Sequence, residues 1–245
     1  MNETIVNEAS LESTAPTMRA ALADYASLIG ELAGDSLSGL TLYGPVLGES
    51  FDPERMTATS VMVVSRIDLG LLRRLAEYGP KLGRSHISAP LVMTPGYIQG
   101  SLDSFPLELL EIHQGHVTLI GRDHFDTLRF DAEHLRLQCE REFKRIGMRL
   151  RQGLLAAGSR EDFLGALEVD IGQHLLRTLR GLIWLKGTKD TLSIDRVLAE
   201  SERLVGEKLP GVGSAIRAHG EHDWAEFQSL YADVEKLAAM ADEHK

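Results

Sequence analysis

Residues Leu40–Val64, with the sequence LTLYGPVLGESFDPERMTATSVMVV, decide how we interpret the fold. An apolar run at Leu40–Tyr43 ends at Gly44-Pro45, and a β-branched apolar run follows at Ser60–Ser65. Runs of this kind are typical of buried strands, and a Gly-Pro pair interrupts a strand. The stretch therefore predicts two core strands joined by a loop, with one helical turn at Val46–Ser50.

The rest of the first half mixes helical and strand patterns. Apolar residues at helical spacing predict a helix over Thr14–Leu32 that stops at Gly34, before a turn at 36–39. A second helix is predicted over Leu69–Tyr78, with Asp68 as its N-cap and Gly79-Pro80 as its end. Three further strands are predicted, over Ala89–Met93, Leu107–His113 and Val117–Ile120, and Thr94-Pro95 starts a helical turn.

From about Asp131 the pattern is helical only. Helices are predicted over residues 132–157, 159–185, 193–205, 209–218 and 224–241. The predicted fold class is therefore α+β, with a mixed sheet flanked by helices and then an all-α helical bundle. The predicted organisation is a loose tail at 1–15, an α/β domain at 16–130 and the bundle at 131–245.

Charge and composition limit the classes of partner. The formal net charge is −10, with 17 acidic and 9 basic residues in 1–131 and 19 acidic and 17 basic residues in the remainder. Nucleic-acid binding needs clustered basic residues against phosphates, so this balance argues against it. With one cysteine, Cys139, the chain forms no internal disulfide. No apolar run reaches the length of a membrane span, and the N-terminus is polar and acidic, so we expect a cytoplasmic protein.

The residues Leu42-Tyr43-Gly44-Pro45, a gap of about a dozen residues and the run Ala58–Val64 carry a resemblance to a known family. They resemble the DNA polymerase β-like nucleotidyltransferase superfamily, in its small bacterial form with a C-terminal helical bundle. Members of that family usually read apolar-Gly-Ser, a similar gap, then Asp-x-Asp and an apolar strand. Residues 105–112 resemble the family's next core strand, which carries a third carboxylate, and 134–142 resemble the opening of the helical domain. The resemblance covers most of residues 20–190.

The family's catalytic acids are replaced in this chain. Nucleotidyl transfer uses two Mg²⁺ ions held by carboxylates, and Asp-x-Asp on a strand places both carboxylates on one face. Here Ala58 and Ser60 occupy those positions, and Pro45 replaces the serine after Gly44. Alanine offers no ligand, serine offers only a neutral hydroxyl, and proline removes a backbone N–H that could meet phosphate. The resemblance thus implies vestigial positions at these four residues.

Displaced acids could supply the missing ligands. Glu49, Asp52 and Glu54 lie in the loop before Ala58, and we favour reading them as solvated loop acids. Glu108 and Glu111 lie three apart on the predicted strand and would therefore face opposite sides. For each of these two, a vestigial metal ligand and an ordinary surface or ion-paired carboxylate both remain open.

Other residues offer chemistry outside the family motif. The stretch His113, His116, Asp123 and His124 would bind zinc only if three or four side chains converged, and we favour separate polar contacts. His219 and His222 are read as surface residues, and Cys139, on the apolar face of its helix, as core. Basic residues line the first bundle helix: Arg136, Arg141, Lys144, Arg145, Arg149 and Arg151. We favour pairs with nearby acids over a patch that binds a phosphate or an acidic partner.

These observations give two expectations of function. The first is a catalytically inactive nucleotidyltransferase-like protein that acts through binding or assembly, with a protein partner or a second copy, no cofactor, no nucleic acid and no membrane. The alternative is an active Mg²⁺-dependent enzyme that moves AMP or another nucleotide to a small molecule or a protein with displaced carboxylates. One half of a toxin–antitoxin-like pair would be a special case of either.

Overall fold

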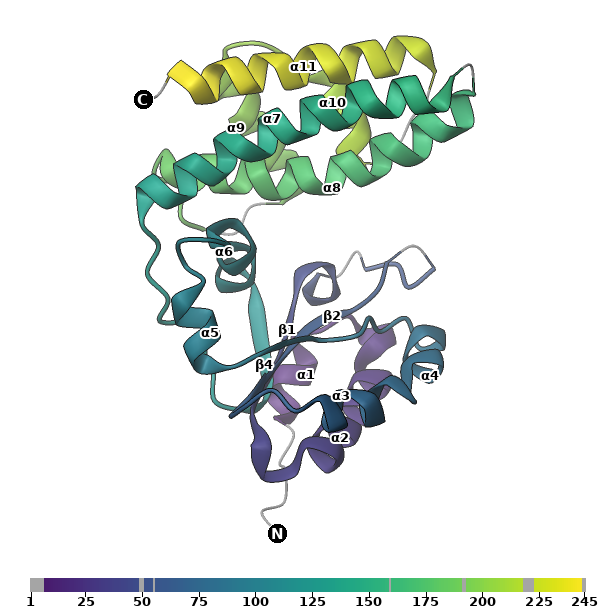
Figure 1. Cartoon of the computed structure of the whole chain (residues 1–245), viewed down its shortest axis with the longest axis vertical. Helices are drawn as coiled ribbons and strands as arrows, with labels where there is room; N and C mark the ends of the chain where they lie inside the picture. Colours follow the sequence, from purple (N-terminus) through teal and green to yellow (C-terminus); the bar gives the residue numbers. More distant parts are fainter. Residues whose placement is uncertain are drawn as a thin grey trace. The chain divides into compact units, whose positions relative to one another are not determined.

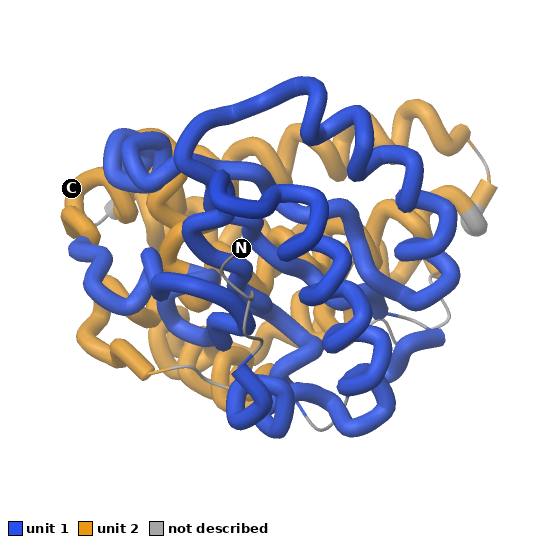
Figure 2. The backbone as a smooth tube through the Cα atoms, turned by 90° about the horizontal axis from the view of Figure 1, so that it is seen from below, with its two compact units in different colours: residues 1–102, 111–129 blue, residues 103–110, 130–245 orange. Residues whose placement is uncertain are grey.

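The computed structural model describes residues 7–48, 51–54, 56–158, 160–190, 193–217 and 223–243. The chain divides into two compact units, shown in blue and orange in Figure 2. Unit 1 comprises residues 1–102 and 111–129, and unit 2 comprises residues 103–110 and 130–245. Each unit has its own hydrophobic core. Residues 103–110, which the sequence assigns to the α/β domain, are grouped with the helical unit.

Unit 1 is built on a four-stranded mixed sheet with the order β3-β2-β1-β4. The strands are β1 (Leu37–Tyr43), β2 (Thr59–Val64), β3 (Leu91–Met93) and β4 (His116–Gly121). Strand β1 pairs antiparallel with both β2 and β4, and β3 adds parallel to β2. The pairing places Leu42 opposite Ser60 and Leu40 opposite Met62. The two apolar runs of the opening stretch are thus adjacent strands, as predicted.

Helix α2 (Arg19–Ala33) packs against this sheet and supplies the main helical side of the unit 1 core (Figure 1). Smaller elements complete the unit: α1 (Glu8–Glu12), η1 (Pro16–Met18), η2 (Gly34–Ser36), η3 (Gly44–Leu47), α3 (Leu69–Ala76), α4 (Gly79–Arg84) and α5 (Pro95–Gly100). The described part of the predicted loose tail is packed. The Asn7 N–H donates to the Leu119 carbonyl at 2.8 Å, and Thr14 and Ala15 are buried.

Unit 2 is helical, with α7 (Ala132–Ala157), α8 (Glu161–Leu185), α9 (Ile194–Val205), α10 (Pro210–Arg217) and α11 (Trp224–Glu243). Figure 1 shows α7, α8 and α11 as long neighbouring helices. Helix α10 lies so close to α8 that a Cβ on Gly172 would meet the Ala215 carbonyl oxygen at 2.2 Å. The α+β class and the helical C-terminal half are therefore confirmed.

The predicted starts of α3, α7 and α11 agree with the structure. Helix α7 has the bounds that the sequence predicts, and the Asp131 carboxylate caps it by accepting the N–H groups of Glu133 and His134. Asp68 caps α3 by accepting the Gly70 N–H at 2.8 Å, and Asp223 accepts the Glu226 N–H at 2.9 Å. These side chains satisfy N–H groups that a helix start leaves without partners.

Three predictions of secondary structure were wrong. Residues Leu107–His113 form no strand, because they lie in helix α6 (Pro106–Gln114). Proline fits the first turn of a helix, and leucine and glutamate are good helix formers. Gly79-Pro80 does not simply end a helix, because it begins α4. The turn predicted at 36–39 is mostly the first part of β1.

Among the described residues, none of the helices combines the length and the apolar character needed to cross a membrane.

Candidate functional site

The Gly44-Pro45 turn connects β1 to η3 and has a backbone reason for its glycine. Gly44 has φ +77°, a value that side chains other than glycine rarely adopt. A Cβ there would also lie 3.2 Å from Thr59 Oγ1, which donates a hydrogen bond of 2.7 Å to the Tyr43 carbonyl. Pro45 lies in the first turn of η3. The turn thus ties the end of β1 to the start of β2.

Ala58 and Ser60, which the resemblance matches to metal-binding acids, are buried in the core of unit 1. Ala58 is 1% exposed, and its N–H donates to the His86 carbonyl at 2.7 Å. Ser60 is 2% exposed, and its hydroxyl lies 2.7 Å from the Tyr25 hydroxyl of α2. Both side chains belong to the sheet face that packs with α2. The prediction that Ala58 and Ser60 share one face of the strand is correct, but that face packs into the core of unit 1.

The partner of Ser60 is itself held in the uncharged state. Burial raises the pKa of Tyr25 to about 12, although the hydrogen bond with Ser60 opposes the shift. Two neutral hydroxyls therefore face each other between α2 and β2, where one donates a hydrogen bond that the other accepts. A buried hydroxyl without such a partner would carry a desolvation penalty, so the pair has a clear structural role.

The displaced acids lie in separate settings. Asp52 accepts the Glu54 N–H at 3.0 Å in an exposed turn, and Glu49 lies outside the described residues. Glu108 and Glu111 are three apart on α6, so they lie near one side of a helix and do not face opposite sides of a strand. Glu108 falls in unit 2 and Glu111 in unit 1. Within the part of the chain that the structure describes, no three His, Cys, Asp or Glu side chains are grouped to hold a metal ion.

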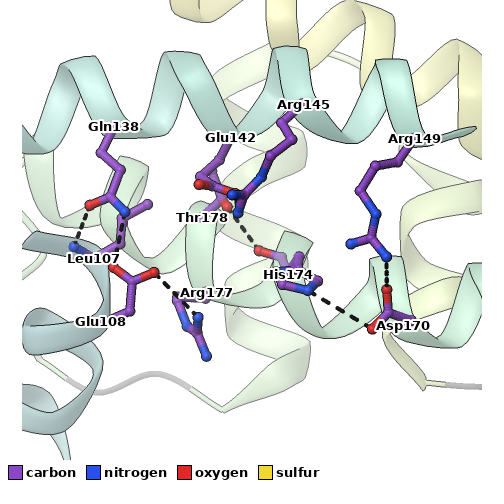
Figure 3. Close-up of polar contacts among 10 residues, drawn as sticks. All are labelled: Leu107, Glu108, Gln138, Glu142, Arg145, Arg149, Asp170, His174, Arg177 and Thr178. Atoms are coloured by element: carbon purple, nitrogen blue, oxygen red, sulfur yellow. Dashed lines mark hydrogen bonds and ion pairs between the residues drawn. The ribbon is translucent and has the colours of Figure 1, made fainter. Parts of the chain in front are cut away.

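Glu108 takes part in a polar network on unit 2. The Gln138 side chain donates to Glu108 at 2.9 Å and accepts the Leu107 N–H at 2.9 Å, which ties α6 to α7 (Figure 3). Arg177 of α8 approaches Glu108 at 3.6 Å. Glu108, one of the two acids on the predicted strand at 107–113, thus has structural contacts inside unit 2.

The same network continues along α7 and α8, where Figure 3 shows cations and acids facing one another. Arg149 pairs with Asp170, and His174 lies 3.9 Å from the same carboxylate. Desolvation lowers the pKa of His174, and the nearby Arg149 and Arg177 lower it further. His174 is therefore mainly neutral at physiological pH. The sequence reading missed Asp170, His174 and Arg177, because only the packing of α8 on α7 brings them together.

The basic residues of α7 are engaged with acids on α7 and on its neighbours. Within α7, Arg136 and Lys144 both pair with Glu140, and Arg145 pairs with Glu142. Across helices, the ion pairs are Lys144 with Asp242, Arg149 with Asp170 and Arg151 with Glu235. Arg141 is exposed and makes no ion pair within the described ranges. The interpretation that we favour from the sequence, in which these basic residues pair with nearby acids, therefore holds for most of them.

The histidines of the His/Asp stretch are held by separate contacts. His113 Nδ1 donates to the Phe125 carbonyl, and His124 Nε2 lies 2.8 Å from the Ser38 hydroxyl. His116 Nε2 contacts Asp123 at 2.9 Å. Burial raises the pKa of Asp123, but hydrogen bonds from backbone N–H groups and the contact with His116 outweigh burial and hold that pKa low. His219 and His222 lie outside the described residues.

Unit 2 also contains a pocket of about 280 Å³ between the start of α7 and the ends of α8 and α11. Its lining combines apolar and charged residues: Ala132, Glu133, Arg136, Cys139, Leu182, Leu185, Lys186 and Ala241. Two cations and one carboxylate share this lining, so charge does not select an anion or a cation. Cys139 is buried, as predicted.

Taken together, the described residues give unit 1 a closed core around Ala58 and Ser60 and give unit 2 a surface of paired charges. Neither arrangement aligns a nucleophile, a base and an orienting group as covalent catalysis requires. The sequence matches no model of a known protein family and none of the curated proteins it was compared with.

Proposed function

We propose that the protein is a catalytically inactive relative of the polymerase β-like nucleotidyltransferases and that it acts by binding a protein partner. The observation that carries this proposal is the contact of 2.7 Å between the Ser60 and Tyr25 hydroxyls. A position that would have to present a carboxylate to Mg²⁺ is instead packed against α2. Ala58, two residues earlier, is buried on the same face.

The closed core supports binding over nucleotidyl transfer for a physical reason. An acid that holds Mg²⁺ must reach an open cleft, because Mg²⁺ keeps several waters and also binds the substrate phosphates. The Ser60 side chain has neither solvent nor space beside it for such a group. Restoring the acid without opening the core would bury an unpaired charge. The proposal therefore assigns this part of unit 1 to scaffolding.

Unit 2 is the part of the chain that we assign to the partner. It is composed of helices whose outer faces carry ion pairs and exposed apolar side chains, among them Met148, Leu155 and Phe163. Protein interfaces are enriched in methionine, arginine and aromatic residues around an apolar centre. The net charge of −10 disfavours a polyanionic nucleic acid as the partner.

Isothermal titration calorimetry with ATP, CTP, GTP and UTP, each with and without Mg²⁺ or Mn²⁺, tests the catalytic part of the proposal. We expect no binding that depends on the metal ion and no release of pyrophosphate. Saturable, metal-dependent binding would overturn it. In that case, Asp52→Asn and Glu111→Gln would show which displaced carboxylate holds the metal, and Asp35→Asn, with an exposed carboxylate in η2, is the matched control.

A further inference from the structure

A row of exposed residues runs along α7 on the side opposite the core of unit 2. Its five members are spaced by four, three, four and three residues: Arg141, Arg145, Met148, Gln152 and Leu155. In an α-helix this spacing keeps side chains on one stripe, about 21 Å long at 1.5 Å per residue. We call these five residues the α7 stripe.

The C-terminal half of the α7 stripe carries two apolar side chains, with Gln152 between them. The Met148 side chain is 51% exposed and that of Leu155 is 83% exposed, so neither contributes to the unit 2 core. They lie two turns apart, about 10 Å along the helix axis. Single exposed apolar residues are common, but two on one stripe beside arginines have the composition of an interface.

Ion pairs run along both edges of the α7 stripe. Toward α8 they are Arg145–Glu142 and Arg149–Asp170, and toward α11 they are Lys144–Asp242 and Arg151–Glu235. These ion pairs restrain the long charged side chains, and Met148 and Leu155 lie between the two sets of ion pairs. A polar rim around an apolar centre is the usual anatomy of a protein interface.

The charge of α7 differs in sign from that of the whole protein. The helix contains six basic and three acidic residues, whereas the whole chain has a net charge of −10. Arg141, at the start of the α7 stripe, is exposed and makes no ion pair in the described part of the chain. The other five basic residues of α7 already pair with acids of α7, α8 and α11, so Arg141 is the cation of this helix that an acidic partner would meet. Complementary charge of this kind speeds encounter and selects orientation.

We propose that the α7 stripe docks an acidic amphipathic helix of a partner protein. The spacing of 3.5 residues is the one that a second helix follows when it packs along the first. Met148 and Leu155 would contact the partner's leucine-type residues, and Arg141 would face its carboxylates. A second copy of α7 fits less well, because parallel packing would bring its arginines against those of the first, and antiparallel packing would set Arg141 beside Leu155. This inference rests on the proposed function and names the partner's chemistry.

Fluorescence anisotropy with synthetic peptides tests the proposal on the full chain. The probe is a labelled amphipathic helix about six turns long, with leucines at heptad a and d positions and glutamates on its flanks. A second probe carries lysines in place of the glutamates. We expect the acidic probe to bind at least about tenfold more tightly than the basic probe, with a preference that weakens at high salt.

Variants then locate the binding. We expect Met148→Gln with Leu155→Gln to weaken the acidic probe at least about fivefold, and Arg141→Glu to weaken it about two- to fivefold. The matched control is Leu69→Gln, which changes a leucine 76% exposed on α3 of unit 1 and should change nothing. Equal binding of both probes, or unchanged binding by the α7 stripe variants, would overturn the proposal.

Two further readouts separate the remaining explanations. If the α7 stripe were covered within the chain, Leu155→Gln would lower the free energy of unfolding, whereas its exposure predicts no change. If a second copy were the occupant, sedimentation would show a dimer that Met148→Gln with Leu155→Gln dissociates. Either result overturns the acidic-helix proposal. Metal-dependent nucleotide binding is measured separately by calorimetry. Failure of the inactive-enzyme proposal can therefore be distinguished from failure of the acidic-helix proposal.

Discussion

Replacing Ser60 by aspartate would place a carboxylate in the core, at the position that the proposed relationship matches to a metal-binding acid. Ser60 is 2% exposed and its oxygen lies 2.7 Å from the Tyr25 hydroxyl. An aspartate side chain has an ordinary pKa near 3.9, so protonating it to keep it neutral in the core costs about 4 kcal/mol at pH 7 and about 1.5 kcal/mol at pH 5. If it stays ionised, the Tyr25 O–H offsets about 1.5–3 kcal/mol of its desolvation. We expect Ser60→Asp to lower the free energy of unfolding by about 3 kcal/mol at neutral pH.

Urea unfolding followed by circular dichroism measures this loss, and Ser60→Asn separates charge from size. Asparagine has the volume of aspartate without its charge, so it should lose only the overpacking part, about 1–2 kcal/mol. The buried carboxyl has a folded pKa above its unfolded value. Its destabilising effect therefore grows as the pH rises toward the folded pKa, and the gap between the two variants should narrow in acid.

Adding millimolar Mg²⁺ to the same urea titrations tests whether residue 60 lies in a closed core or in an open cleft. We expect no stabilisation of Ser60→Asp by Mg²⁺ or Mn²⁺, because the side chain is closed from solvent. The reasoning would be refuted if Ser60→Asp were as stable as the parent protein, or if either ion selectively restored its stability. Both results would mean that this face of β2 opens to a metal.

At Asp123, the Asn variant should lower the free energy of unfolding by about 1 kcal/mol at pH 7. The pKa of Asp123 is lowered in the folded protein, so the stability that its carboxylate contributes is lost as the pH falls through that folded pKa. The free energies of unfolding of the parent protein and of Asp123→Asn, measured in urea, should therefore converge in acid, and a difference that stays constant with pH would contradict this. Gly172→Ala should lose about 2–3 kcal/mol in thermal unfolding, because its Cβ meets the Ala215 backbone, whereas Gly83→Ala has open space; equal melting would contradict this. Burial raises the pKa of Cys139 to about 12, so Ellman's reagent should label the native protein about a hundredfold more slowly than the unfolded protein; rapid native labelling would count against it.

The elements that local sequence determines were predicted well. Helix α7 has strong apolar periodicity, a capping Asp131 and a terminal glycine at 158, and its predicted bounds agree with the structure. Strand β2 is β-branched and apolar along its length, and such a run has few alternatives in a core. These signals depend on neighbours in sequence, so packing did not alter them.

Helix α6 shows where local pattern was insufficient. Its apolar residues at 107, 109, 110 and 112 fit an alternating strand and a short helix about equally well. The helix is selected by tertiary contacts: Leu107 packs at Gly181 of α8, where a Cβ would come within 2.2 Å, and its N–H is bound by Gln138. The resemblance to a family strand favoured the wrong choice.

The candidate site was limited by a different ambiguity. The period of two places Ala58 and Ser60 on one face, but it does not say whether that face meets solvent or α2. The answer depends on Tyr25, which lies 35 residues before Ser60 in the chain. For the same reason, the contacts of Glu108 with Arg177 and of Arg149 with Asp170 join residues that are distant in sequence.

The division of α6 between the two units affects how the protein could be cut into fragments. Leu107 and Leu110 belong to the core of unit 2, although they precede the residues of unit 1 from 111 to 129. A fragment that begins at residue 131 would lack both leucines and would leave a hole beside Gly181 and Cys139. A fragment that begins at residue 103 would retain them, but it would carry residues 111–129, including β4, without the strand that β4 pairs with. Neither half can be excised cleanly, so we expect the protein to fold well only when both units are expressed as one chain.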